Sequence, residues 1–380
     1  MKQHNGLSTP VSRRSLLALA VSGLAGCGGG AGGGLVAGLP GTGGTGLFAQ
    51  GTIIGFGSVI VNGIRFDDTA ATVQLDGVTA STQDLRLGMV ADVQGLRGAD
   101  LTLGVANAIE VWSVAQGLVS QVQGGQFKVA GMLMQADAAT VFDGISSVAA
   151  LANGQRVAVW GLQSGTDGSR WTATRVAVVS ATVLVSTGIV SAAGTLNGFA
   201  LSGQKAASLA SGQLVRVQGP LSSSGASVQV DSFKLLGLQS GSLPQGDVEI
   251  EGLVTALLSG SRFMLGSVEV DASSASLAAS YKALSIGQRI EVEGNWQGRV
   301  LKAVVFGVES EQKLDEAEIE AKIEQFTNLS NFVVRGQRCN ASSATISKGT
   351  VADLKVGVKV KLHGTKAGDV LMVTTLEFSS

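Results

Sequence analysis

Side chains that commonly act as nucleophiles, general bases or metal ligands are scarce in this chain of 380 residues. It contains two His, two Cys and one Tyr. Zinc sites use several His or Cys ligands, and a triad-type serine nucleophile needs a neighbouring His. His4 falls in an N-terminal segment that we expect to be removed, which leaves only His363. The sequence therefore predicts no catalytic residue, no metal site and no cofactor, and it favours a protein that is not an enzyme.

His363 and Cys339 occupy positions that favour structural roles. In an internal repeat described below, His363 takes the place held by Trp160 and Glu293 in other copies. A position with such varied residues is typical of an outward strand face. Cys339 takes the place of Phe66, in a column of apolar residues. We therefore expect Cys339 to be a small, buried hydrophobic residue.

Tryptophan is the one side chain type here that could bind a ligand by stacking. There are four Trp, and Trp160 and Trp171 fall in adjacent predicted strands. If they share one surface, they could stack on the rings of a sugar. The alternative is that they pack in a core or across strands.

The N-terminus has the pattern of an export signal. Arg13 and Arg14 precede a short apolar segment at 16–24, and small residues follow. The run Leu24-Ala25-Gly26-Cys27 resembles the lipobox of bacterial lipoproteins. The resemblance implies cleavage after residue 26 and lipidation of Cys27, which would anchor the chain to a membrane.

Two further features of the N-terminus bear on how the chain is exported and on which membrane it reaches. The run Ser-Arg-Arg-Ser-Leu-Leu at 12–17 resembles a twin-arginine motif, although Sec export remains open. Gly28 follows Cys27, where inner-membrane lipoproteins usually carry Asp. The family pattern thus implies an outer-membrane lipoprotein that faces the periplasm or the cell surface.

A glycine-rich segment follows the lipobox. Residues 28–46 include 11 Gly in 19 positions, a composition typical of a flexible coil. We interpret residues 27–49 as the lipidated Cys and a disordered tether.

The charge balance argues against nucleic acid as a partner. Removing residues 1–26 takes away three basic residues and no acidic ones, which leaves 24 basic and 28 acidic residues. Proteins that bind nucleic acid usually present a basic groove.

A five-fold internal repeat dominates the rest of the chain. Its pattern is L-x-x-G-x-x-Φ-x-Φ-x-G, where Φ is a mostly apolar position. The first Gly of each copy is Gly88, Gly154, Gly212, Gly287 or Gly357. We expect the Leu to plug a core, the first Gly to form a tight turn at positive φ, and the alternating residues to form a half-buried strand that the last Gly ends or bulges.

Each repeat unit contains enough strand signals for a small barrel. An opening strand, two short strands, the repeat block and a closing strand give about five strands in roughly 60–70 residues. Closing such a sheet removes its edges and buries one face of every strand. We therefore predict an all-β chain of five tandem OB-like barrels, each closed on itself, with no sheet running from one module into the next. An open β-solenoid is the alternative.

The predicted modules follow the signal and the tether. Their bounds are 50–113 for module 1, 116–181 for module 2, 186–238 for a shortened module 3, 247–309 for module 4 and 318–380 for module 5.

The repeat as a whole resembles the domain of unknown function 5666 family, which occurs in tandem in bacterial exported proteins. The blocks LANGQRVAVWG at 151–161 and WTATRVAVV at 171–179 carry the resemblance. It extends over about residues 50–380 and implies no activity.

Repetition without a repeated reactive group favours a non-enzymatic binding or scaffolding array in the cell envelope, because several weak modules can add their affinities. The expected partners are the membrane, through the lipid anchor, and an envelope protein or polysaccharide. The alternatives are an exported hydrolase with an unrecognised site and a purely structural spacer.

Overall fold

The computed structural model describes residues 45–236, 246–277, 283–308 and 315–379. Within them the chain is all-β, with short 3₁₀ turns and no α-helix. The predicted signal, the lipidation site Cys27 and the tether up to residue 44 lie outside the described residues. No helix long and apolar enough to cross a membrane occurs in the part of the chain that the structure describes.

Module 1 is a closed five-stranded barrel. It comprises β1 (Thr45–Phe56), β2 (Val59–Val61), β3 (Ile64–Asp67), β4 (Thr72–Leu75), β5 (Val78–Ala80), the 3₁₀ turn η3 (Thr82–Asp84), β6 (Val90–Arg97) and β7 (Leu103–Val111). The ring runs β1-β2-β3-β7-β6 and returns to β1; only the β3–β7 pair is parallel. The β4–β5 hairpin extends the sheet along β7. This is the strand order of an OB-fold, so the predicted architecture is confirmed.

Modules 2, 4 and 5 close in the same order. Module 2 has β8 (Ala115–Gln123), β9 (Gln126–Val129), β10 (Met132–Asp143), η4 (Val148–Ala150), β11 (Arg156–Gln163) and β12 (Arg170–Val178). Module 4 has β19 (Asp247–Leu257), β20 (Arg262–Leu265), β21 (Val268–Asp271), β22 (Ser276–Leu277), β23 (Arg289–Gln297) and β24 (Val300–Val308). Module 5 has β25 (Glu316–Asn328), β26 (Asn331–Val334), β27 (Gln337–Asn340), β28 (Thr345–Ser347), η7 (Val351–Asp353), β29 (Lys359–Ala367) and β30 (Val370–Phe378).

Module 3, the shortened copy, is split between two sheets. It contains β13 (Leu184–Ile189), β14 (Thr195–Leu196), β15 (Phe199–Ser202), η5 (Ala206–Ser208), β16 (Leu214–Gly219), β17 (Ser227–Gln229) and β18 (Ser232–Leu235). Strands β13, β16 and β18 join the sheet of module 2, while β14, β15 and β17 form a small separate sheet.

The glycines and the Leu of the repeat pattern can be compared with the turn, the bulge and the plug that the sequence predicts. All five first glycines have positive φ, between 80° and 88°. In modules 1, 2, 4 and 5 the last Gly follows a bulge between the two final strands of the barrel. The repeat Leu is buried in three modules, as Leu85, Leu151 and Leu354. The interiors of the four closed barrels are filled, with Val59, Phe127, Phe263 and Phe332 at most 1% exposed.

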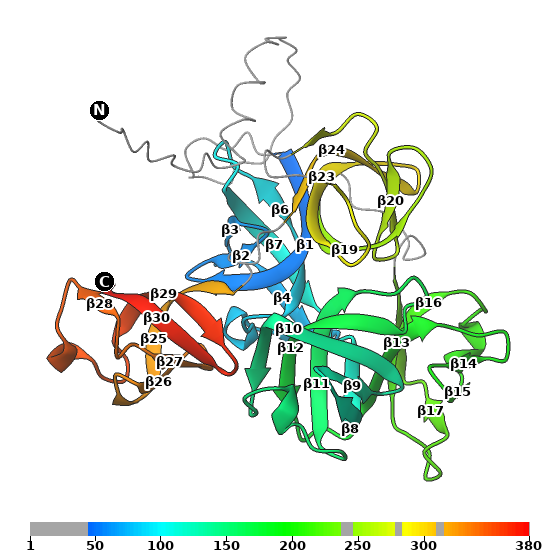
Figure 1. Cartoon of the computed structure of the whole chain (residues 1–380), viewed down its shortest axis with the longest axis horizontal. Coiled ribbons are helices and arrows are strands. Elements are labelled where there is room, and N and C mark those ends of the chain that lie inside the picture. Colours follow the sequence, from blue (N-terminus) through cyan, green and yellow to red (C-terminus); the bar gives the residue numbers. More distant parts are fainter. Residues whose placement is uncertain (1–44, 237–245, 278–282, 309–314, 380) are drawn as a thin grey trace, which may run out of the picture.

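The expectation that sheets stop at module boundaries is wrong. Strand β1 pairs in parallel with β19 of module 4 over Leu47–Gln50, and with β25 of module 5 at Gly55 and Phe56. In addition, β13 of module 3 meets β8 of module 2 at one residue pair. Strand β1 is 12 residues long. At each point where it pairs with β6 or β2 of its own barrel, its opposite edge can pair with β19 or β25 of another module. Figure 1 shows the result: module 1, in blue and cyan, lies between module 4 (yellow) and module 5 (orange and red), above the green modules 2 and 3.

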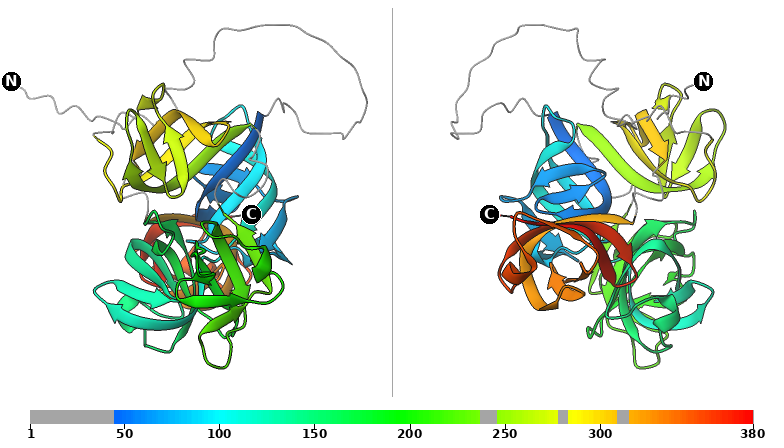
Figure 2. Two further views of the ribbon diagram at one scale, coloured as in Figure 1. Left: turned by 90° about the vertical axis from the view of Figure 1, so that its right-hand side faces the viewer. Right: turned by 60° about the vertical axis from the view of Figure 1, so that its left-hand side comes forward.

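The predicted tether also ends earlier than residue 49. Strand β1 begins at Thr45, and Leu47 and Ala49 are buried. Residues 45–52 pair with β6, which gives this end of the glycine-rich segment a fixed strand conformation. The two further views in Figure 2 show the blue strand β1 alongside the yellow-green first strand of module 4, with which its first half pairs.

Candidate functional site

A cavity of about 360 Å³ lies where modules 1, 2, 3 and 4 meet. It is lined by residues of β1 and β6, by the connection between modules 1 and 2, by parts of β11, β16, β18 and β19, and by the turn between β20 and β21. Its volume falls in the range of small-molecule sites, which is about 300–1,000 Å³. Because the barrels themselves are filled, this space between them is the candidate binding site.

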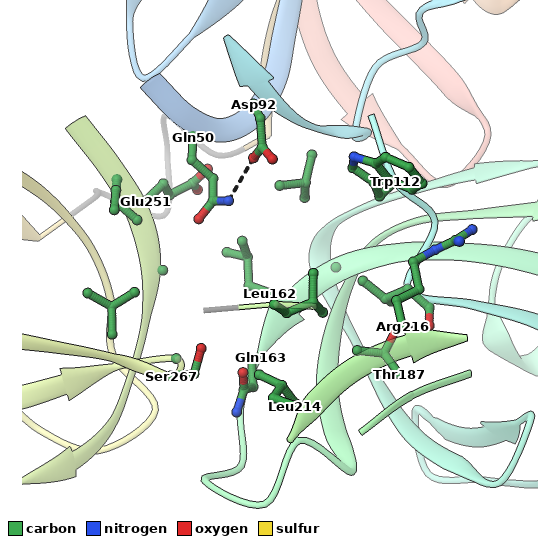
Figure 3. Close-up of a pocket in the computed structure, with 18 of the residues that line it drawn as sticks. Gln50, Asp92, Trp112, Leu162, Gln163, Thr187, Leu214, Arg216, Glu251 and Ser267 are labelled. Carbon is green, nitrogen blue, oxygen red and sulfur yellow. Dashed lines mark hydrogen bonds between the residues drawn. The ribbon is translucent and has the colours of Figure 1, made fainter. Parts of the chain in front are cut away.

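One side of the cavity is polar. The Gln50 side-chain amide donates to Asp92 Oδ1 at 2.7 Å, and Figure 3 shows the two side chains together above Leu162. Lys234 of β18 lies 3.1 Å from Glu110 Oε2 and 3.5 Å from Asp92 Oδ2. The ammonium group of Lys234 therefore links the end of β7 to β6.

Trp112 connects this polar side to a buried arginine. Its indole N–H donates to Glu110 Oε2 at 3.2 Å. The Lys234 ammonium lies 4.3 Å from the centroid of the Trp112 ring, and the Arg216 guanidinium carbon lies 5.1 Å from it. Both contacts are within the range of cation–π attraction.

Arg216 is the largest fully buried side chain in the described chain. Its Nε donates to the carbonyl oxygen of Ser113 at 2.7 Å, and its Nη2 lies 2.7 Å from Asp76 Oδ1. Burial lowers the pKa of the Arg216 guanidinium, and the ion pair with Asp76 opposes this effect. Arg216 thus fastens module 3 to the connection between modules 1 and 2.

Glu110 is held in its ionised form. Partial burial alone would raise the pKa of its carboxyl group, but the nearby Lys234 ammonium and the hydrogen bonds from Lys234 and Trp112 outweigh burial and lower this pKa. The polar side of the cavity thus carries a carboxylate at neutral pH.

The opposite side is mostly apolar. Figure 3 shows Leu162 and Leu214 there, with the smaller polar side chains of Gln163 and Ser267. The Gln163 amide N–H donates to the Gly165 carbonyl oxygen at 2.7 Å. Further apolar lining comes from Trp171, Leu253, Leu265, Val268 and Trp296, whereas Ile250 lies beside Gln50 across the β1–β19 pair. Polar groups on one side and apolar groups on the other are the usual composition of a small-molecule site.

Trp160 and Trp171 pack in hydrophobic clusters, which is the alternative interpretation of these residues, and they do not share one surface. Both are buried, at 8% and 7% exposed, and they pack in different hydrophobic clusters. Trp160 packs between barrels, in the cluster that includes Leu87 of module 1, whereas Trp171 packs in the core of module 2. The bulge opposite Gly161 adds one unpaired residue, Thr174, to β12, and it shifts the alternation of sides along that strand between the partner of Trp160 and Trp171. Trp171, but not Trp160, lines the cavity.

The predictions for His363 and Cys339 are confirmed. His363 is exposed on β29, and Cys339 is 1% exposed in a hydrophobic cluster. Burial raises the pKa of the Cys339 thiol to about 12.

A cluster of Glu249, Glu291 and Glu293 brings three carboxylates within 4.8 Å of one another on module 4. Arg97 of module 1 forms ion pairs with Glu249 and, at 3.3 Å, with Glu293. The Arg97 guanidinium supplies the positive charge that a metal ion would otherwise bring to these carboxylates. We therefore interpret the cluster as part of the contact between modules 1 and 4.

Sequence reasoning did not assign the polar lining of the cavity. Asp92, Trp112 and Lys234 do not recur at matching places in the other modules, and Gln50 recurs only as Gln116 of module 2, so the repeat pattern gives them no role. The available signal was the tryptophan between the end of module 1 and the start of module 2. Its role becomes visible only when the modules are packed together.

Comparison with known proteins supports the modular description. Residues 116–177, 251–304 and 320–373 match the family model "Domain of unknown function (DUF5666)". These regions fall in modules 2, 4 and 5. The comparison with curated proteins finds no match. Among solved structures, the chain is similar to one described as "drosophila Unr CSD456", with 12% sequence identity, 45% of this chain and 79% of that chain covered, and a TM-score of 0.15.

Proposed function

We propose that this chain, three regions of which match the family model "Domain of unknown function (DUF5666)", is a non-enzymatic binding protein of the cell envelope. In this proposal the modules form a scaffold, and the cavity between modules 1 to 4 binds a small molecule. The carrying observation is the cavity itself, which has both polar and apolar lining and a volume of about 360 Å³.

The construction of the cavity supports binding over a spacer role. Four modules contribute to its wall, and Arg216, Arg97 and β1 hold those modules together. A spacer needs only end-to-end contacts between neighbours in sequence. Here module 1 pairs with modules 4 and 5, which are distant in sequence, and their packing encloses a shared space.

The chemistry of the lining supports binding over hydrolysis. A hydrolase would be expected to gather convergent reactive groups in one module. Among the residues that the structure describes, the lining contains no His and no Cys. Its polar residues Gln50, Asp92, Glu110, Lys234 and Arg216 already bind one another or the backbone.

The envelope location rests on the lipobox. We expect Cys27→Ser to release the protein from the membrane fraction, because the substituted side chain cannot receive the diacylglycerol. Fractionation of cells that express the full chain tests this, with wild type as the control. Retention of the variant in membranes after a carbonate wash would show that lipidation is not the anchor.

Binding is tested with an uncharged fluorescent probe, N-phenyl-1-naphthylamine, and the mature chain carrying Cys27→Ser so that no lipid interferes. We expect saturable fluorescence enhancement that Ser267→Phe abolishes, because the half-buried Ser267 lines the cavity and a phenyl ring would fill it. Ser274→Phe, on an exposed turn of the same module, is the matched control and should leave binding unchanged. Equal binding by all three chains would place the probe elsewhere and reject the cavity as the site.

A further inference from the structure

The charges around the cavity are unequal, and this inequality points to a ligand class. We propose that the cavity selects small amphipathic cations, an amine carried on a compact apolar body, over anions of the same shape. The inference rests on the proposed binding function and adds the chemistry of the ligand to it.

The first step concerns Lys234. Its ammonium lies 3.1 Å from a carboxylate oxygen of Glu110 and 3.5 Å from one of Asp92. One positive charge therefore faces two carboxylates, which leaves an excess of one negative charge on the polar side. Gln50 donates a neutral hydrogen bond to Asp92 and does not change this balance.

The second step concerns the other cation in the lining. Arg216 is 2% exposed and is directed toward Asp76 and the Ser113 carbonyl oxygen. Its charge is balanced by Asp76 and held by contacts between modules, so it is a poor partner for an incoming anion. Glu251, the remaining carboxylate of the lining, is paired with Arg289. The local excess of negative charge therefore stays at Asp92 and Glu110.

The third step concerns the body of the ligand. The far side of the cavity is formed by Leu162, Leu214 and Trp171 together with Leu253 and Leu265. Burying an apolar ring there is favourable by about 25 cal/mol per Å². A polysaccharide would place hydroxyl groups against these side chains without partners, which is costly. The space corresponds to about a dozen water molecules at ~30 Å³ each, which suits a two-ring body with a short amine.

Three probes with one ring system separate charge from shape: 2-naphthylmethylamine, 2-naphthylmethanol and 2-naphthoate. They are cationic, neutral and anionic at pH 7, and calorimetric titration of the mature Cys27→Ser chain gives each affinity. We expect the amine to bind most tightly. The affinity for 2-naphthoate should be lower by roughly tenfold or more, because its negative charge would lie close to the excess negative charge of the protein.

Two opposite substitutions test the assigned charges. Asp92→Asn removes one carboxylate and should lower the affinity for the amine roughly tenfold while leaving the alcohol unchanged. Lys234→Met keeps the apolar stem over Trp112 and should strengthen the preference for the amine. Asp231→Asn, an exposed acidic position of module 3 outside the lining, is the control and should change neither affinity.

The outcomes separate the two proposals. In one outcome all three probes bind, Ser267→Phe abolishes this binding, and the affinity for the carboxylate equals or exceeds the affinity for the amine. That outcome would overturn the charge selection and leave the binding function standing. A preference for the amine that Asp92→Asn and Lys234→Met do not alter would also overturn it. Absence of binding by every probe would overturn both.

Discussion

The backbone N–H of Gly154 donates a hydrogen bond to the carbonyl oxygen of Val119 at 2.9 Å, and the Val119 N–H returns one to Gln155. This pair of bonds ties the turn after the plug to the middle of the first strand of module 2. The equivalent glycine makes the same bond in every module, to Ile53, Val190, Val254 or Ile323, at 2.7–2.9 Å. The repeat is therefore a closure device: the first Gly lets the chain turn so that the fourth strand meets the first.

Replacing Gly154 with Val tests this device. Gly154 has a φ of +85° with no other atom within 4 Å of the position of a new Cβ, so conformational strain alone should act. We expect a loss of about 1–3 kcal/mol in the stability of module 2, measured by chemical denaturation. Asn153→Val, at the neighbouring exposed turn position, is the control and should change stability little. Equal stability of both variants would show that the positive φ carries no cost.

The last glycine of the repeat acts through space rather than through φ. A Cβ on Gly161 would lie 2.5 Å from the Thr172 carbonyl oxygen across the bulge, whereas one on Gly117 would have no neighbour closer than 3.6 Å. We expect Gly161→Ala to cost about 1–3 kcal/mol because strands β11 and β12 must separate. Gly117→Ala should be neutral or should stabilise by up to about 1 kcal/mol. The pair is compared by urea unfolding; a similar effect at both sites would contradict the role of the bulge.

The sequence predicts the modules well because each signal acts locally. Gly154 requires a turn, Gly161 a bulge and Leu151 a plug whatever the rest of the molecule does. The turn recurs in all five modules, the bulge in four and the buried Leu in three. The relation between modules depends on outward faces, where the sequence pattern is weak. Trp112 and Lys234 read as ordinary surface residues until modules 1 and 3 are packed together.

The errors have the same physical origin. Adjacent strands alone do not tell whether Trp160 and Trp171 share a surface, because the bulge opposite Gly161 adds Thr174 to β12 and changes which side Trp171 faces. The sequence does not indicate the start of β1 at Thr45, because Gly46 continues a glycine-rich segment and its strand conformation depends on pairing with β6 and β19.

The contact between modules 1 and 4 should depend on Arg97. Its side chain is 8% exposed and pairs with Glu249, which is fully buried. Arg97→Ala removes the cation that neutralises this carboxylate, and we expect a loss of about 3–5 kcal/mol. Arg262→Ala, which removes the more exposed pair with Glu269, should cost at most about 1 kcal/mol.

Small-angle scattering of both variants reports whether the modules stay together. We expect Arg97→Ala to enlarge the particle by loosening module 4, and Arg262→Ala to leave its size unchanged. Unchanged scattering and stability in Arg97→Ala would show that β1–β19 pairing alone holds the contact.

Lys366 makes the stability of the molecule depend on pH. It belongs to module 5, is 7% exposed, and donates to the Ala139 carbonyl oxygen of module 2 at 3.3 Å. Burial, helped by the charge of Arg289, lowers the pKa of its ammonium from 10.5 to about 8. Between pH 8 and 10.5 the unfolded chain therefore binds more protons than the folded one, so stability rises with pH in this window.

Between pH 7 and 9 this group should add about 1 kcal/mol to the free energy of unfolding. Lys366→Met should remove that increase, while Lys348→Met, at an exposed pair with Glu377, should preserve it. Urea unfolding at the two pH values measures both. The buried Cys339 thiol acts in the opposite direction, since its raised pKa lowers stability as pH rises from 9 toward 12, so the comparison stops at pH 9. An increase that persists in Lys366→Met would assign the pH dependence to other groups.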